Sequence, residues 1–267
     1  MEEQDYKRNK ISAGSYDINK FLFGGYDTDI ITTIYGPPAC GKTNLCMLAT
    51  VSQAKKGNKV IFIDTEGGFS IERFKQLAQE DFQESIQNVI LLQPTSFEEQ
   101  IKAFFALLKE LNPSDFTRQN KNEQKTNEVA RKGKIGLIVV DGMTMLYRLE
   151  LAEARTNKDE AKIDSVNSEL AKQMRILSEI SRKQNIPILI TNQGYSEFLS
   201  EEELRAGKKK EFYMVGGSIL QYWSKCIIEL QNDRGKRKMV LRKHRSLPEK
   251  EMEFEILSGG IRKRGWI

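Results

Sequence analysis

The first residues with types and spacing suited to chemistry form a glycine-rich stretch, Gly36-Pro37-Pro38-Ala39-Cys40-Gly41-Lys42-Thr43. It follows an apolar run at 30–35 and opens a segment of helical length at 43–56, the context that the pattern GxxxxGK[ST] requires. Backbone N–H groups of such a loop, with Asn44 next in the helix, can surround phosphate oxygens. Lys42 adds a positive charge, and the Thr43 hydroxyl can coordinate Mg²⁺. We therefore predict a phosphate-binding loop; a plain glycine turn is the alternative.

A second candidate is Asp141, which ends the apolar run IGLIVVD at 135–141. The carboxyl ends of parallel strands meet at one edge of a sheet, where ligands bind. If this strand neighbours the one before the phosphate loop, the Asp141 carboxylate can hold the water shell of Mg²⁺ beside Thr43. An aspartate that only caps a helix or forms a turn is the alternative, and the phosphate loop favours the metal site.

Two more strand ends carry side chains suited to nucleotide hydrolysis. Glu66 lies just beyond the run KVIFID at 59–64 and can polarise the water that attacks a terminal phosphate. Asp64 lies at the same edge, and a merely solvated Glu66 is the rival interpretation, so the residues leave this assignment open. Gln193 closes Thr191-Asn192-Gln193 at the end of a further strand, where a side-chain amide can sense the γ-phosphate and signal to the following loop.

The elements that must position these side chains alternate along the chain. Short β-branched runs predict buried parallel strands at 30–35, 59–64, 88–92, 135–141 and 186–191. Between them, segments of helical length occur at 43–56, 71–80, 96–111 and 163–184, with Ser70 and Ser96 as N-cap candidates. This alternation predicts an α/β fold with a mainly parallel central sheet and helices on both faces.

The chain after Tyr222 changes character. The runs KCIIEL, RKMVLRK and MEFEIL predict antiparallel strands, with a hairpin turn at Asn232-Asp233-Arg234-Gly235. We predict one domain over 1–267, with a flexible N-terminus at 1–10. Three segments are expected to lie outside regular structure, namely an exposed insertion at 112–134, a charged stretch at 148–162 and a long loop at 195–214.

Composition narrows the class of protein. Lys and Arg number 42 against 37 Asp and Glu, a net charge of +5, and the excess gathers late in the chain, which permits anionic partners. No apolar run reaches the roughly 20 residues of a membrane helix, and residues 1–10 do not resemble a signal peptide. We expect a cytoplasmic protein with no membrane contact, whose cysteines, Cys40, Cys46 and Cys226, serve packing.

Five motifs in order, GPPACGKT, DTEGGFSIERF, LIVVD, ITNQ and VGGSILQYWSK, resemble the RecA/RadA recombinase family from about Ile11 onward. The resemblance implies a RecA-type P-loop ATPase that binds ATP and Mg²⁺. It assigns Glu66 as the catalytic glutamate, Gln193 as the γ-phosphate sensor and Arg73 as the arginine that packs on adenine. By position alone, it makes 148–162 and 195–214 the two DNA-binding loops.

Lys243-His244-Arg245 is similar to a KxR pair that related ATPases insert into a neighbouring subunit's nucleotide site, as an arginine finger does. Such a role for Lys243 and Arg245 would require a homo-oligomer. A solvated basic strand end is the competing interpretation, and the residues leave both open.

Departures from the family pattern shape the expected role. The full recombinases carry an N-terminal helical domain and a Phe-x-x-Ala linker motif, neither of which occurs in 1–10, and the insertion 112–134 has no counterpart. We therefore expect a weakly hydrolysing accessory protein of recombination and repair that binds single-stranded or branched DNA without exchanging strands. The alternatives are a nucleotide-gated regulator of RadA or a Holliday-junction resolvase, both reasonable partners, and a KaiC-like signalling ATPase.

Overall fold

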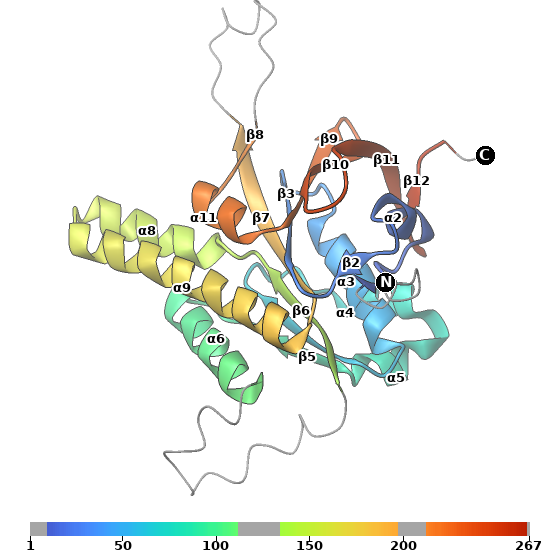
Figure 1. The fold of residues 1–267 in the computed structure, drawn as a ribbon, viewed down its shortest axis with the longest axis horizontal. Helices are drawn as coiled ribbons and strands as arrows, with labels where there is room; N and C mark the ends of the chain where they lie inside the picture. The colour runs from blue at the N-terminus through green and yellow to red at the C-terminus, as the bar shows by residue number, and fades with distance from the viewer. Residues whose placement is uncertain (1–9, 112–133, 197–211, 266–267) are drawn as a thin grey trace, which may run out of the picture.

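The computed structural model describes residues 10–111, 134–196 and 212–265. The predictions for 1–9, for nearly all of the insertion 112–134 and for the centre of 195–214 lie outside these residues. Within them, the chain forms a large central sheet flanked by helices (Figure 1). A small antiparallel pair, β1 (Lys10–Ile11) and β2 (Tyr26–Asp27), precedes it.

The central sheet confirms the predicted parallel core. Its strands follow the order β12-β11-β10-β9-β3-β7-β6-β4-β5, with β8 paired to β7. The parallel strands are β3 (Ile31–Gly36), β4 (Lys59–Asp64), β5 (Val89–Leu92), β6 (Ile135–Asp141), β7 (Ile188–Ser196) and β9 (Cys226–Asp233). The antiparallel additions are β10 (Lys236–His244), β11 (Lys250–Leu257) and β12 (Gly260–Lys263). The C-terminal runs predict β10 and β11 but not β12. The run KCIIEL forms β9, which pairs antiparallel with β10 as predicted but parallel with β3.

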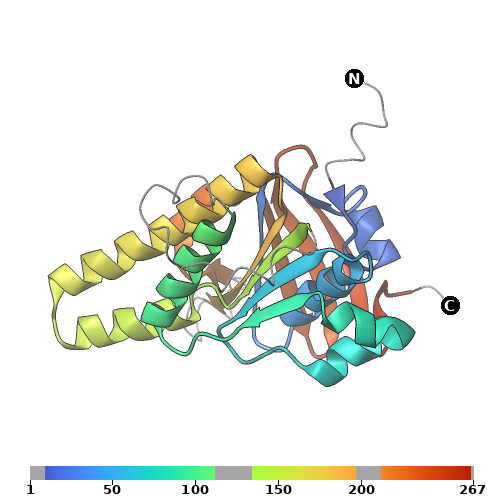
Figure 2. The same ribbon diagram turned by 90° about the horizontal axis from the view of Figure 1, so that it is seen from below.

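Alternate side chains of the parallel strands enter different cores. In β4, Val60 and Phe62 join one hydrophobic cluster, whereas Ile61 and Ile63 join the other, as the pleat of a strand buried on both faces requires. Helices α2 (Tyr16–Phe21), α3 (Lys42–Ala54), α4 (Ile71–Ala78) and α5 (Phe82–Ile86), with the 3₁₀ turn η1 (Gln79–Asp81), cover the first face. Helices α6 (Phe97–Leu111), α8 (Met145–Thr156), α9 (Glu160–Gln184) and α11 (Gly217–Trp223) cover the second (Figure 2).

The prediction of a loose segment at 148–162 is wrong. Helix α8 runs to Thr156 and α9 begins at Glu160, so the two helices form an antiparallel hairpin (Figure 1). Leu151 and Ala154 are buried beneath α8, and their spacing places them on one helical face. The charges that suggested a loop occupy the opposite, solvated face.

The end of β7 also differs from expectation. Residues 191–193 were expected to end a strand, but β7 continues to Ser196 because its last residues pair antiparallel with β8 (Phe212–Met214). The two flanks of the predicted loop at 195–214 are therefore strands. Gln193 lies inside a long strand, with its neighbours held by two ladders.

Several local predictions are confirmed. Ser70 accepts a hydrogen bond from the backbone N–H of Arg73 at the start of α4. The turn between β9 and β10 places Arg234 and Gly235 at positive φ, as a two-residue hairpin turn requires. The cysteines are buried and unbridged. Among the described residues, no helix is long and apolar enough to cross a membrane.

Candidate nucleotide-binding site

The predicted phosphate loop connects the end of β3 to the start of α3. Two of its residues have positive φ, Ala39 at 58° and Gly41 at 110°. A Cβ atom on Gly36 would lie 2.4 Å from the carbonyl oxygen of Leu230, so only glycine lets the loop pack against β9. No side chain in the described part of the chain caps α3, which leaves its first N–H groups to bind an anion.

Lys42 lies inside the loop. Its ammonium donates to the carbonyl oxygens of Gly36 and Pro37, at 3.1 and 3.0 Å, and its side chain is almost fully buried. The sulfur of Cys40 lies 3.9 Å from the same nitrogen, and burial raises the pKa of that thiol. The loop therefore encloses the positive charge of the Lys42 ammonium next to the N-terminus of α3.

Asp141 lies at the carboxyl edge, but not on a strand beside β3. Strand β7 separates β6 from β3, so the two strands are not neighbours, which was the condition attached to this prediction. The contact with the loop is nevertheless made by side chains, because Thr43 Oγ1 donates to Asp141 Oδ2 at 2.7 Å. The intervening strand contributes Thr191, whose hydroxyl donates to Asp141 Oδ1 at 2.5 Å.

Burial is the main influence on Asp141. It raises the pKa of the carboxyl, and the negative charges of Glu66 and Asp64 act in the same direction, against the hydrogen bonds from Thr191 and Thr43. A buried carboxylate beside two acids is electrostatically costly unless a cation is near. The hydroxyl and carboxylate oxygens gathered here are the ligand types that Mg²⁺ prefers.

The structure separates the roles of the two acids after β4. Both oxygens of Asp64 accept backbone hydrogen bonds, from Gly68 and Phe69, each at 3.0 Å. Asp64 therefore holds the turn after β4, and its carboxylate is occupied. Glu66 is exposed, and its Oε1 accepts a hydrogen bond from Gln193 Nε2 at 3.2 Å.

A residue that the sequence did not single out extends this contact. Arg148 Nη1 on α8 donates to Gln193 Oε1 at 3.4 Å, which gives a chain from Arg148 through Gln193 to Glu66. Such an arrangement can hold the amide of Gln193 in one orientation. Arg148 falls in the segment predicted to be loose. Only the helical spacing of the apolar residues of α8 could have pointed to it.

The end of β7 is hydrogen-bonded to Val215, which lies just after β8. Asn192 Nδ2 donates to the carbonyl oxygen of Val215 at 2.6 Å, and Asn192 Oδ1 accepts a short hydrogen bond from Thr144. The backbone N–H of Val215 in turn donates to the carbonyl oxygen of Gln193 at 3.1 Å. These hydrogen bonds connect the backbone of Gln193 to Val215, two residues before α11.

Arg73 lies on α4 at the side of the phosphate loop. Its Nε donates to Asn44 Oδ1 at 2.8 Å, and its terminal nitrogens donate to the carbonyl oxygens of Leu257 and Ser258, at 2.8 and 2.9 Å. These hydrogen bonds lie in the guanidinium plane, and a planar guanidinium can stack an aromatic ring on its face at the same time. The structure thus brings Arg73 and Asn44 together at the start of α3.

Lys243 and Arg245 lie at the other end of the sheet. His244 pairs with Cys226, which pairs with Thr32, so this segment lies near the amino end of β3, about 13 Å along the strand from Gly36. Within one chain, these side chains are remote from the phosphate loop. Lys243 Nζ donates to the carbonyl oxygen of Gln221 at 2.7 Å.

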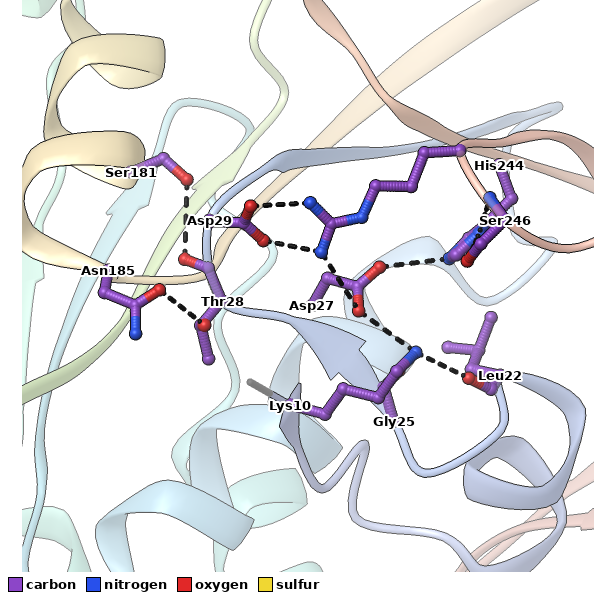
Figure 3. Close-up of polar contacts among 11 residues, drawn as sticks. Lys10, Leu22, Gly25, Asp27, Thr28, Asp29, Ser181, Asn185, His244 and Ser246 are labelled. Atoms are coloured by element: carbon purple, nitrogen blue, oxygen red, sulfur yellow. Dashed lines mark hydrogen bonds and ion pairs between the residues drawn. The ribbon is translucent and has the colours of Figure 1, made fainter. Parts of the chain in front are cut away.

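Arg245 belongs to a polar cluster around Asp27 (Figure 3). Its guanidinium donates to both oxygens of Asp29, at 2.5 and 2.7 Å. His244 Nε2 lies 3.2 Å from Asp27 Oδ2. The N–H of Ser246 donates to His244 Nδ1, so the neutral ring carries its proton on Nε2, the nitrogen that faces Asp27. Lys10 completes the cluster with a contact of 3.1 Å to Asp27.

Comparison with known proteins agrees with this geometry. The family model described as Rad51 matches residues 6–264. The chain is 39% identical over 258 residues to the DNA repair and recombination protein RadB of Methanobrevibacter smithii, covering 95% of each chain. It is 36% identical to RadB of Methanococcus maripaludis and 37% identical to RadB of Methanocaldococcus jannaschii, each over 91% of this chain and 96% and 98% of the relative. The chain therefore belongs to the Rad51 family of RecA-type proteins.

Proposed function

We propose that the protein is a DNA-binding accessory factor of recombination and repair, which binds MgATP, hydrolyses it slowly and does not exchange strands. The observation that carries the proposal is the contact between Thr43 and Asp141, 2.7 Å apart, beside the ammonium of Lys42. The relatives' names, "DNA repair and recombination protein RadB", support DNA as the second ligand.

The residues of the loop fit a nucleoside triphosphate. The free N–H groups at the start of α3 and the buried ammonium of Lys42 would hold the phosphates. Thr43 and Asp141 would hold Mg²⁺, directly and through water, and the bound ion would neutralise negative charge on the phosphates. A Cβ atom on Gly68 would lie only 3.4 Å from Asp141 Oδ2 and Thr43 Oγ1, so the turn after β4 stays close to this site.

Glu66 is the group best placed to act as the base. Its carboxylate is exposed and contacts Gln193, whereas Asp64 accepts hydrogen bonds from two backbone N–H groups. Gln193 holds one oxygen of Glu66 and leaves the other to orient a water molecule. Slow turnover is supported by Arg245, whose paired contact with Asp29 would have to break before it served a neighbouring subunit.

Gly142→Ala is expected to lower the hydrolysis rate about 100-fold while nucleotide binding stays within a few-fold. Gly142 has φ of 91°, and a Cβ atom there would lie 2.6 Å from Glu66 Cγ and 2.4 Å from Thr65 Oγ1, so Glu66 must shift. Gly57→Ala is the matched control, since Gly57 also has positive φ but nothing within 4 Å of an added Cβ atom. Phosphate-release rates that fall equally in both variants would contradict the placement of Glu66.

The proposal as a whole is tested by phosphate release with and without single-stranded DNA, alongside a strand-exchange assay on the same sample. Slow hydrolysis with little stimulation and no exchange is expected. Rapid, strongly stimulated hydrolysis with exchange would identify a strand-exchange recombinase instead. A protein that neither binds MgATP nor hydrolyses it would refute the nucleotide site itself.

A further inference from the structure

A concave surface outside the nucleotide site lies between α2 and the strands β11 and β12. Its volume is about 450 Å³, and it shares no residue with the phosphate loop. Phe21 and Met252, both buried, form an apolar base. Tyr16, Lys20, Lys250 and Lys263 are among the residues that line it, and we call this surface the α2 groove.

The groove has an excess of positive charge. Lys20, Lys250, Arg262 and Lys263 line it against two acids, Asp17 and Glu251. Both acids already have partners, because Asp17 accepts from the backbone N–H of Lys263 at 2.7 Å and Glu251 accepts from Lys238 at 3.0 Å. Lys20 and Lys263 are exposed, and within the described residues their ammonium groups form no ion pair. Lys20 and Lys263 therefore remain able to bind an external anion, whereas Arg262 Nη2 lies 3.5 Å from Glu255 Oε2.

Exposed aromatic rings stand near both ends of α2. Tyr16 is 78% exposed and Phe23 is 70% exposed. The span of α2 separates them by roughly 10 Å, about the rise of three stacked nucleotides. Both rings offer a large apolar surface to solvent.

The backbone of Phe23 is strained. It has φ of 54°, a conformation that a bulky side chain adopts only with strain. The ammonium of Lys250 lies 4.5 Å from the centroid of the Phe23 ring and 5.1 Å from that of Phe21, yet most of the Phe23 ring stays exposed. Burial of the ring therefore does not offset the strain, which is the expected pattern for a side chain that contacts a ligand.

We propose that the α2 groove is an additional binding site for single-stranded DNA, distinct from the nucleotide site and from the segment at 195–214. Phosphates would contact Lys20 and Lys263, and bases would stack on Tyr16 and Phe23, as in sequence-tolerant single-strand binding. An acidic peptide would satisfy the cations but leave both rings without a stacking partner. The inference rests on the proposed function, which makes DNA a ligand.

The test uses fluorescence anisotropy of a fluorescein-labelled 20-nucleotide poly(dT) strand across a range of salt concentrations. Lys20→Glu/Lys263→Glu is expected to weaken binding at least tenfold and to reduce the salt slope by about 1.4, for two lost phosphate contacts. Tyr16→Ala is expected to weaken binding about tenfold through lost stacking. The control, Lys56→Glu/Lys75→Glu, makes the same change in net charge at exposed positions outside the groove and should bind nearly as the wild type.

The outcomes separate the two proposals. If the wild type does not bind poly(dT) even at low salt, the proposed function fails together with this site. If the wild type binds and the groove variants bind equally well, DNA is held elsewhere and only the α2 groove is refuted. Unchanged DNA affinity together with loss of polyglutamate binding in the groove variants would assign the surface to an acidic polypeptide instead. Circular dichroism checks that each variant is folded.

Discussion

Lys42→Ala should abolish ATP hydrolysis and weaken ATP binding at least tenfold, whereas Glu66→Gln should lower hydrolysis about 100-fold with binding unchanged. The buried ammonium of Lys42 is the only fixed cation that the described part of the loop encloses, so its loss removes both phosphate binding and charge stabilisation. Glu66 contacts Gln193 rather than the loop, and glutamine preserves its size and that hydrogen bond.

Two measurements separate these effects. Titration with a fluorescent ATP analogue in Mg²⁺ gives the dissociation constant, and phosphate release under saturating ATP gives kcat. Lys56→Ala, an exposed lysine at the other end of α3, serves as the control for loss of a positive charge. Equal losses of binding in Lys42→Ala and Glu66→Gln would overturn the assignment of roles.

Asp27→Ala should be among the most destabilising single changes, at about 3–5 kcal/mol. Asp27 is only 5% exposed and contacts Lys10, whose side chain is 8% exposed, and the ring of His244. Removal of the carboxylate leaves the buried ammonium of Lys10 with two backbone carbonyl acceptors, Leu22 and Gly25, but without its counter-charge. Asp29→Ala is the matched control, because the Asp29–Arg245 pair is 38% exposed on both sides and should contribute less than about 1 kcal/mol.

Urea denaturation at pH 7 measures both variants, and its pH dependence provides a second readout. Burial tends to raise the pKa of Asp27, but the hydrogen bond from His244 and the charge of Lys10 outweigh it and lower that pKa overall. A lowered pKa means that the folded state favours the carboxylate. This stabilisation is complete above about pH 4, the unfolded value, and is lost as the pH falls through the folded value. Equal stability of the two variants would show that the cluster is not a buried ion pair.

Sequence periodicity was sufficient to predict where the strands lie in the chain, but not the order in which they pair in the sheet. Runs such as 59–64 and 135–141 are short, β-branched and bounded by polar residues, so local pattern identifies them as strands. Pairing is a non-local property, and nothing in the run that contains Thr191 indicates that β7 separates β3 from β6. The Thr43–Asp141 contact was predicted from the motifs, although the strand arrangement assumed for it was wrong.

The errors in the candidate site have a common cause. Many charges in 148–162 suggested a loop, although Leu151 and Ala154 already carried a helical spacing. Arg148 was missed because its helix was missed. The partner of Arg245 is Asp29, 216 residues away in the sequence, so that contact leaves no local signature in the chain.

Strand β7 links two sites, because it contacts the carboxylate of Asp141 and also pairs with β8. At one level Thr191 holds the carboxylate of Asp141, and five residues further on the strand ends in the ladder with β8. If β7 moves as one unit, a ligand that shifts its β8 end also shifts the Thr191 hydroxyl that positions the carboxylate. Because linkage is reciprocal, that ligand and the proposed magnesium nucleotide would then change each other's affinity by the same factor. The two binding sites would then be coupled through a single strand, β7.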